Sequence, residues 1–400
     1  MDAPYNTPAL EPQLSRQVHI VGFTTKARFI AHSLAPIPQL PPVKILTHHN
    51  PSVAAKWLNE GRAINLHDAR GRFVSSHPIK CPEYFGPRMG SPVVTRWDGG
   101  LLDNVIVNTS TSALYPTLRS LKHAIDNRTT LCLIHPGLGY IERLNEDIFD
   151  DPAVRPTYVL GHMTHRLSRH YDKSMSLRIK DSYGEFLMSV LPRYGHGKLP
   201  PAEEVQRKHL LALLSMNRAL DPKGMNWIHF LHRKLPGMIW SSVADSISVI
   251  LGCRYDQIFQ DTHAVKLWNG LLDETLEIIL SLPEFENKEF LRCYFAKADF
   301  RAGLKMRLGT CGPNYSEWIS QIRHGDITDV DFINGYFVRR AEELGIDCRL
   351  NKLAISMVKA RHQARMTELR GAIPFSLRPY MLDRDKLGGR ESEDSPDLNL

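Results

Sequence analysis

Several features that would settle the class of this 400-residue chain at once are missing from its sequence. No apolar run approaches the roughly 20 residues that a membrane-spanning helix needs. The six cysteines stand far apart and form no C-x-x-C pair, which favours reduced thiols in an intracellular compartment over disulfides or a zinc cluster. We therefore expect neither a membrane span nor a metal site.

A recognisable targeting segment is also lacking. The first sixteen residues include Asp2, Glu11 and three prolines, so they resemble neither a secretory signal nor an Arg-rich presequence. We expect residues 1–16 to be a flexible N-terminus, and the mitochondrion and the cytoplasm both stay open as locations.

The bulk composition is that of an ordinary globular protein, with 42% hydrophobic and 23% charged residues. A chain of this length suits two domains, because single cores stop growing at roughly 250–300 residues. The net charge of +7 and the pI near 9.0 imply mild attraction to anionic partners, but they do not identify a nucleic-acid binder.

The hydrophobic pattern changes once along the chain. Apolar strand patterns at 43–47, 63–66, 104–108, 130–135, 157–163 and 176–180 alternate with helix patterns at 25–34, 52–60 and 113–125. The stretch 70–97 shows only irregular strands and loops. Helix patterns then dominate, at 202–216, 227–251, 262–282, 331–344 and 351–362.

This pattern predicts an α/β fold in which a Rossmann-like dinucleotide-binding domain, residues 17–197, precedes an all-helical domain, residues 198–370. The polar, charged tail at 383–400 is expected to be disordered.

The first strand runs into a turn with an incomplete glycine fingerprint. The three positions of G-x-G-x-x-G hold Gly22, Thr24 and Ala27. Alanine is accepted at the third position, whereas Thr24 places a β-branched side chain where a pyrophosphate would lie. Lys26, at the start of the helix, can hold a phosphate by charge.

The end of the second strand has no acidic residue to take the ribose hydroxyls of NAD. It offers His48 and His49 instead. NAD is therefore disfavoured, and His49 is a candidate for the extra phosphate of NADP(H); two exposed loop histidines are the alternative.

A late segment resembles the ketopantoate reductase (2-dehydropantoate 2-reductase) family. Ser316-Glu317-Trp318-Ile319, Arg323 to Asp331 and Asn334-Gly335 are similar to the family's S-S-M-x-x-D-x-x-x-G-x-x-T-E-I-D … N-G segment. Pro136-Gly137-Leu138-Gly139 resembles its N-G-x-G turn. The resemblance implies a divergent member, with a helical domain like that of 6-phosphogluconate dehydrogenase.

The resemblance also implies a set of site residues, and the chain departs from it. The turn asparagine falls on Pro136 and the lysine after the fourth strand on Ser110. Counted back without gaps from Cys253, the catalytic lysine falls on Gly237 and the two helix asparagines on Ser241 and Asp245.

Lys234, close to one helical turn before Gly237, is the candidate replacement for that catalytic lysine, with Asp329 in place of the family's glutamate. Candidate substrate-binding residues are Ser316, Ser241 and Asp245. Candidate cofactor-binding residues are Gly22, Thr24, Lys26, Ala27, His49 and Gly137.

Two functions follow from these residues. The first hypothesis is a family member with eroded NADPH and catalytic motifs that acts as a non-catalytic binding or assembly factor, mitochondrial or associated with RNA or the ribosome. The alternative is an active NADPH-dependent reductase of a 2-keto acid of the 2-dehydropantoate type, in which a lysine stabilises the alkoxide that forms. The sequence leaves open whether the NADP(H) site is retained or lost. It also leaves open whether the chain binds a protein or RNA partner and whether it forms a homodimer.

Three other groups of residues were weighed. His162, His165 and His170 lack the glutamate of H-E-x-x-H, so we interpret them as ordinary histidines. The basic run Arg361 to Arg370 could contact phosphate, but we interpret it as the solvated face of the last helix. The basic stretch from Arg166 to Arg193 is the better candidate for an RNA or acidic-protein surface, although no RNA-binding motif accompanies it.

Overall fold

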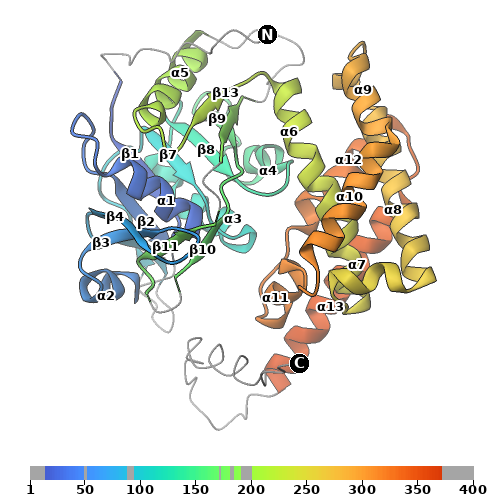
Figure 1. Cartoon of the computed structure of the whole chain (residues 1–400). Helices are drawn as coiled ribbons and strands as arrows, with labels where there is room; N and C mark the ends of the chain where they lie inside the picture. The colour runs from blue at the N-terminus through green and yellow to red at the C-terminus, as the bar shows by residue number, and fades with distance from the viewer. Residues whose placement is uncertain are drawn as a thin grey trace, which may run out of the picture.

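The computed structural model describes residues 14–48, 52–87, 94–170, 173–180, 184–190 and 201–371. A sheet-containing part and a helical part lie side by side (Figure 1). His49 and the tail at 383–400 lie outside the described residues, as do residues 1–13 of the expected flexible N-terminus. Ser15 is described, and its carbonyl accepts hydrogen bonds from Asn104 Nδ2 at 2.7 Å and His209 Nε2 at 2.9 Å.

The large sheet has nine strands in the order β13-β12-β9-β8-β7-β1-β2-β5-β6. All pairings from β5 through β2, β1, β7 and β8 to β9 are parallel, which is the doubly wound order of dinucleotide-binding folds. This confirms the predicted Rossmann-like fold. The strands are β1 (Val18–Val21), β2 (Lys44–His48), β5 (Glu83–Pro87), β6 (Val94–Thr95), β7 (Asn104–Val107), β8 (Thr130–Ile134), β9 (Thr157–Met163), β12 (Phe186–Ser189) and β13 (Pro222–Gly224).

The central strands are apolar on both sides because helices cover both faces of the sheet. In β7, Val105 and Val107 point to one core and Ile106 points to the other. The first core includes residues of α3 (Thr111–Leu121) and α4 (Tyr140–Asp147), and the second includes residues of α1 (Thr25–Leu34) and α5 (Pro201–Ser215).

A second, four-stranded sheet lies against α1, in the order β10-β11-β3-β4. Its strands are β3 (Ala63–His67), β4 (Phe73–Pro78), β10 (Leu167–Arg169) and β11 (Ser176–Ile179), and α2 (Ser52–Asn59) precedes it. The stretch 70–97, which the sequence pattern leaves irregular, thus supplies β4, β5 and β6.

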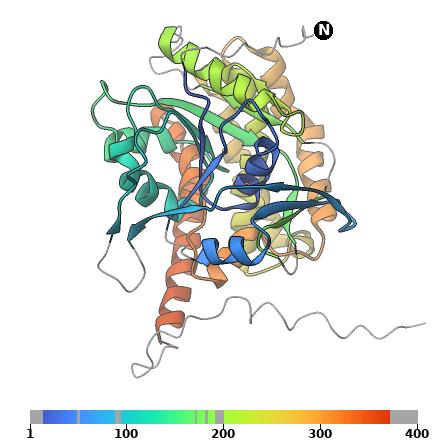
Figure 2. The same cartoon turned by 90° about the vertical axis from the view of Figure 1, so that its left-hand side faces the viewer.

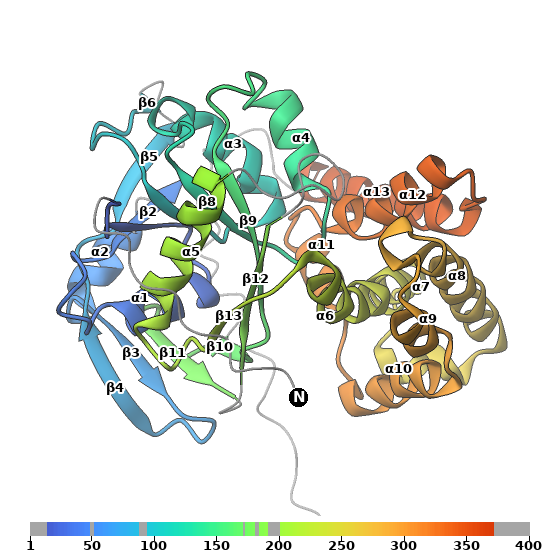
Figure 3. The ribbon, with the colours of Figure 1, turned by 90° about the horizontal axis from the view of Figure 1, so that it is seen from above.

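The helical part begins at α6 (Trp227–Trp240), which leads away from the sheet (Figure 3). A π-helical turn (Ser241–Asp245) links α6 to α7 (Ser246–Leu251), so the predicted helix at 227–251 contains an irregular turn. The remaining helices are α8 (Thr262–Leu280), α9 (Glu289–Ala296), α10 (Ala298–Cys311), α11 (Glu317–Arg323), α12 (Asn334–Leu344) and α13 (Arg349–Gly371). Figure 2 shows the length of α13, which continues well beyond the predicted end at 362.

The predicted domain boundary at 197/198 precedes two elements that the structure places with the sheet. Helix α5 packs on β8, β9 and β13, and β13 pairs with β12. Leu210 and Leu213 of α5, and Leu220 between α5 and β13, belong to the core that α1 shares with the sheet. No helix in the described part of the chain is long and apolar enough to cross a membrane.

Candidate active site between the two parts

The strand order reverses between β1 and β7, and doubly wound sheets bind ligands in a crevice at the carboxyl ends of two such strands. Gly22 ends β1 with φ of +112°, and a Cβ on it would lie 2.2 Å from the carbonyl oxygen of Asn108. Both the backbone angle and this close approach require glycine. Gly22 therefore has the turn-forming role expected of the first glycine of the fingerprint.

Thr24 turns its side chain toward the protein. Its Oγ1 accepts a hydrogen bond from the Ala27 amide at 3.1 Å, which caps α1, and it donates to Asn108 Oδ1. Asn108 Nδ2 in turn donates to the carbonyl of Ile134 at 2.5 Å. Thr24 thus joins the α1 turn to the end of β7 across the crevice, while Ala27 is buried against the sheet.

Two lysines from different parts of the chain face the same region. Lys26 lies in the first turn of α1, and Lys234 lies on α6, where its Nζ donates to the carbonyl of His135 at the end of β8. Burial and, to a smaller extent, the positive charge of Lys26 lower the pKa of Lys234 to about 7, against the opposing charge of Asp329. Burial likewise lowers the pKa of Lys26, against the opposing charges of Glu317 and Asp329.

Asp329 provides the buried carboxylate of this cluster. It is 8% exposed and accepts a hydrogen bond from Thr111 Oγ1, at the start of α3. Burial raises its pKa, while that hydrogen bond and the two lysines lower it. Asp329 is therefore the carboxyl that faces both lysines in this group.

Two histidines next to the lysines are held neutral. Burial, with smaller contributions from the charges of Lys234 and Lys26, lowers the pKa of His135 to about 3 and that of His162 to about 2. Neither ring nitrogen of His135 has a hydrogen-bond partner among the described residues. In this electrostatic environment further positive charge is strongly disfavoured.

The turn from Pro136 to Gly139, which follows β8, packs against Phe332 of the helical part. A Cβ on Gly137 would lie 2.1 Å from the carbonyl oxygen of Phe332, and that carbonyl accepts from the Leu138 amide at 2.8 Å. The rings of Tyr140 and Phe332 stack with centroids 4.0 Å apart. We call the contacts of Gly137, Leu138 and Tyr140 with Phe332 the domain seam; they bring Asp329 to the sheet.

The other candidate residues lie around this cluster. Ser316 is buried and caps α11 through its side chain, which accepts from the Ile319 amide at 3.3 Å. Ser241 begins the π-helical turn that Asp245 ends. Burial raises the pKa of Asp245 to about 6, although Tyr255 donates a hydrogen bond to its carboxylate.

The remaining positions have simpler surroundings. Gly237 lies on α6, where no atom would lie within 4 Å of an added Cβ, and Ser110 precedes α3. His48 ends β2 with its ring against Gly86 and Phe85. The described residues contain no group of three or more His, Cys, Asp or Glu side chains that could hold a metal ion.

Sequence reasoning did not single out Thr111, His135 or Glu317 for this site. Glu317 directly follows Ser316 in the late motif, so its position there was a usable signal. No sequence signal marks Thr111, because its partner Asp329 lies 218 residues later in the chain.

The chain is similar in sequence and in fold to known proteins. Residues 229–362 match a family model described as "Ketopantoate reductase PanE/ApbA C terminal". A 2-dehydropantoate 2-reductase of Saccharomyces cerevisiae is 24% identical over 319 residues, which cover 70% of this chain and 77% of the yeast protein.

Solved structures show the same fold. A ternary structure of D-mandelate dehydrogenase with NADH and anilino(oxo)acetate covers 88% of this chain and 99% of its own, with a TM-score of 0.59 and 13% identity. A dimeric ketopantoate reductase of Staphylococcus aureus covers 87% and 99%, with a TM-score of 0.58 and 13% identity.

Proposed function

The chain belongs, as a distant homologue, to the ketopantoate reductase PanE/ApbA family, and from this premise we propose that it is an NADPH-dependent oxidoreductase that reduces a 2-keto acid of the 2-dehydropantoate type. The observation that carries the proposal is the meeting of Lys234, Lys26 and Asp329 where the strands of a doubly wound sheet end. The buried Lys234 and the half-buried Lys26 face one buried carboxylate there. An anionic ligand is the natural complement of such a site.

Lys234 has the position and the pKa for a proton donor. Reduction of a ketone places negative charge on its oxygen, and an ammonium group nearby stabilises that charge and supplies the proton. A group with a pKa near 7 serves this role well at neutral pH, because it is partly protonated and gives up its proton readily. The negative charge of Asp329 favours the protonated forms of both lysines. Lys26 is placed to attract the carboxylate of a keto acid or a phosphate.

The turn after β1 fits a dinucleotide in part. The amides of Thr25 and Lys26 lie in the first turn of α1 and have no acceptor within the helix, so they can donate to a phosphate, and Lys26 adds a positive charge. Thr24 already uses the Ala27 amide. When bound, NADPH supplies the hydride; Lys26 and the amides of Thr25 and Lys26, in the turn that Gly22 opens, would hold its phosphates, and His49 stays a prediction for the extra phosphate of NADP(H).

The proposal is tested by titrating the purified protein with NADPH while following cofactor fluorescence, and then by measuring NADPH oxidation with 2-dehydropantoate. We expect binding and turnover in the wild type. Lys234→Ala should retain binding and lose turnover by about 10²- to 10⁴-fold. Lys266→Ala, an exposed lysine on α8, is the matched control and should behave as the wild type. Binding without turnover in the wild type would overturn the proposal.

The second candidate is a non-catalytic binding protein built on the same fold. It is favoured by the Thr24 to Asn108 hydrogen bond across the crevice and by Pro136 in place of the turn asparagine. This candidate predicts no turnover with any 2-keto acid. A homodimer, as in the Staphylococcus aureus enzyme, is part of our proposal. An RNA- or ribosome-associated role and a mitochondrial location stay predictions from the sequence.

A further inference from the structure

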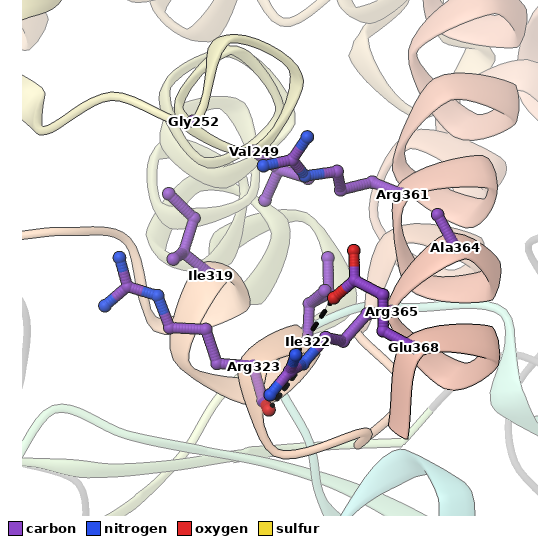
Figure 4. Close-up of a pocket in the computed structure, with 9 residues that line it drawn as sticks. All are labelled: Val249, Gly252, Ile319, Ile322, Arg323, Arg361, Ala364, Arg365 and Glu368. Carbon is purple, nitrogen blue, oxygen red and sulfur yellow. Dashed lines mark hydrogen bonds and ion pairs between the residues drawn. The ribbon is translucent and has the colours of Figure 1, made fainter. Parts of the chain in front are cut away.

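A cavity of about 350 Å³ lies in the helical part, between α7, α11 and α13 (Figure 4). It shares no residue with the lysine cluster, and its size is in the range of small-molecule sites. Its lining combines apolar side chains with charged ones: Val249, Gly252, Ile319, Ile322, Arg323, Arg361, Ala364, Arg365 and Glu368.

The apolar side chains form a firm floor. Val249, Ile319 and Ile322 are 1%, 8% and 5% exposed, respectively, and all belong to the large hydrophobic core. A floor that is packed from behind keeps its shape without a ligand, which reduces the entropy cost of binding.

The arginines differ in how far their charges are already balanced. Arg365 donates from Nη1 to Glu368 Oε2 at 2.9 Å and from Nε to the Arg323 carbonyl at 3.1 Å, so its charge is paired and its side chain is fixed. Within the described part of the chain, neither Arg323 nor Arg361 pairs with a carboxylate. The guanidinium of Arg323 lies 4.4 Å from the centre of the Tyr315 ring, which orients it.

Both unpaired arginines line the cavity, and in Figure 4 Arg361 reaches over the apolar side chains while the guanidinium of Arg323 points away from α13. Arg361 reaches from α13 toward α7, where its Nη2 would lie 3.5 Å from a Cβ on Gly252, and Ile319 lies between it and Arg323 in Figure 4. That distance is an ordinary van der Waals contact, so Arg361 lies directly over the end of α7. Arginine presents a planar set of donors that matches the oxygens of a carboxylate or a phosphate.

We propose that this cavity is a binding site for a small organic anion, in which an apolar body rests on Val249, Ile319 and Ile322 and an acidic group pairs with Arg361 and Arg323. The site is separate from the proposed active site and does not depend on it. Helix α11 connects the two, because Glu317 at its start faces Lys26 while Ile322 and Arg323 line the cavity.

The test uses benzoate as the probe and benzamide, which has the same shape without the charge, as its control. Binding to the full chain is measured by isothermal titration calorimetry and by saturation-transfer NMR. We expect benzoate to bind the wild type, and benzamide to bind at least about tenfold more weakly, since a hydrogen bond to a charged group contributes roughly 1.5–3 kcal/mol.

Variants then locate the site. Arg361→Gln and Arg323→Gln should each weaken benzoate binding by about tenfold or more, and Arg361→Lys by less. Arg370→Gln, on the same helix but outside the cavity, should bind as the wild type, and so should Lys234→Met, which alters only the proposed active site. All of these variants except Lys234→Met should keep wild-type reductase turnover.

Three results would overturn the proposal. One is no benzoate binding, and another is equal binding of benzoate and benzamide. The third is benzoate binding that Lys234→Met abolishes and Arg361→Gln leaves intact, because this would place the anion at the lysine cluster. If the wild type shows no reductase turnover, the proposed function fails, but the benzoate measurements still test this cavity.

Discussion

At Lys234, burial and a neighbouring positive charge act in the same direction. The buried site disfavours the ammonium form, the charge of Lys26 disfavours it further, and Asp329 only partly compensates, so the pKa falls to about 7. Buried lysines with a strongly lowered pKa occur often at functional sites. We therefore propose that Lys234, about one turn earlier, takes the role of the lysine that the gap-free count places at Gly237.

The first prediction concerns the pH dependence of turnover. In the proposed reaction the protonated form of Lys234 is the proton donor, so kcat should fall as the pH rises through about 7 and continue to fall by about tenfold per pH unit above it. A pH series of kcat at saturating NADPH and substrate checks this. A kcat that stays constant from about pH 6 to pH 9 would rule out Lys234 as the donor.

The second prediction concerns stability. Below pH 7 both the folded and the unfolded protein carry the Lys234 charge, so the cost of burying it is fully present. Between pH 7 and the unfolded value near 10.5, the unfolded chain binds one more proton, so the free energy of unfolding attributable to this group rises with pH.

Lys234→Met, which keeps the volume and removes the charge, should therefore be more stable than the wild type at pH 6, and the difference should shrink by pH 9. Denaturant unfolding at the two pH values measures it. A difference that grows with pH would contradict the lowered pKa.

Among the elements, α1 decides whether the crevice accepts a dinucleotide. Its first turn keeps the glycine that the chain path requires and gives the second glycine position to Thr24, whose hydroxyl both caps the helix and reaches Asn108. The turn therefore forms with threonine in place of the second glycine, because the Thr24 hydroxyl caps α1 and its hydrogen bond to Asn108 ties the turn to the end of β7.

The third prediction tests this element. Thr24→Gly removes a branched side chain from the crevice, and glycine is only a few tenths of a kcal/mol worse than threonine at a helix N-cap. NADPH should bind more tightly to this variant. Thr24→Ser keeps the cap and is the control, with affinity close to the wild type. Weaker NADPH binding by Thr24→Gly would mean that the threonine itself contacts the cofactor.

Helix α6 shows why the sequence could not assign the lysine alone. The helix pattern at 227–251, which includes Pro236, correctly predicts a helical segment but not its π-helical turn at Ser241–Asp245. A π-helical turn bonds i to i+5, so the residues before it are rotated relative to an unbroken α-helix. Counting back from Cys253 therefore does not give the face of α6 that meets the sheet.

For the whole molecule, the fold was more predictable than the site. Runs of buried apolar residues such as Thr130–Ile134 predict strands from the local sequence. The change from alternating strand and helix patterns to helix patterns alone predicts the sheet-containing part and the helical part. The contacts of Thr111 with Asp329 and of Lys234 with His135 join distant parts of the chain, and no local pattern encodes them. The sequence pattern assigns residues 201–224 to the helical domain, although they pack on the sheet, because α5 has an ordinary helix pattern.

The fourth prediction concerns the domain seam. Gly137→Ala would place a Cβ against the Phe332 carbonyl, a backbone atom that cannot move aside cheaply, so the two parts must shift apart. We expect destabilisation by about 1–3 kcal/mol, as for other overpacked sites, and a lower kcat, because the seam sets the distance from Asp329 to the lysines. Thermal unfolding and kcat measure both effects. An unchanged kcat in a folded variant would contradict this role of the seam.

The most direct test of the central claim is the rate of NADPH oxidation with 2-dehydropantoate, compared between the wild type and Lys234→Ala at matched cofactor saturation. We predict turnover in the wild type and a loss of about 10²- to 10⁴-fold in the variant, with NADPH binding retained. Equal rates in the two proteins, or no turnover in the wild type although NADPH binds, would contradict the account.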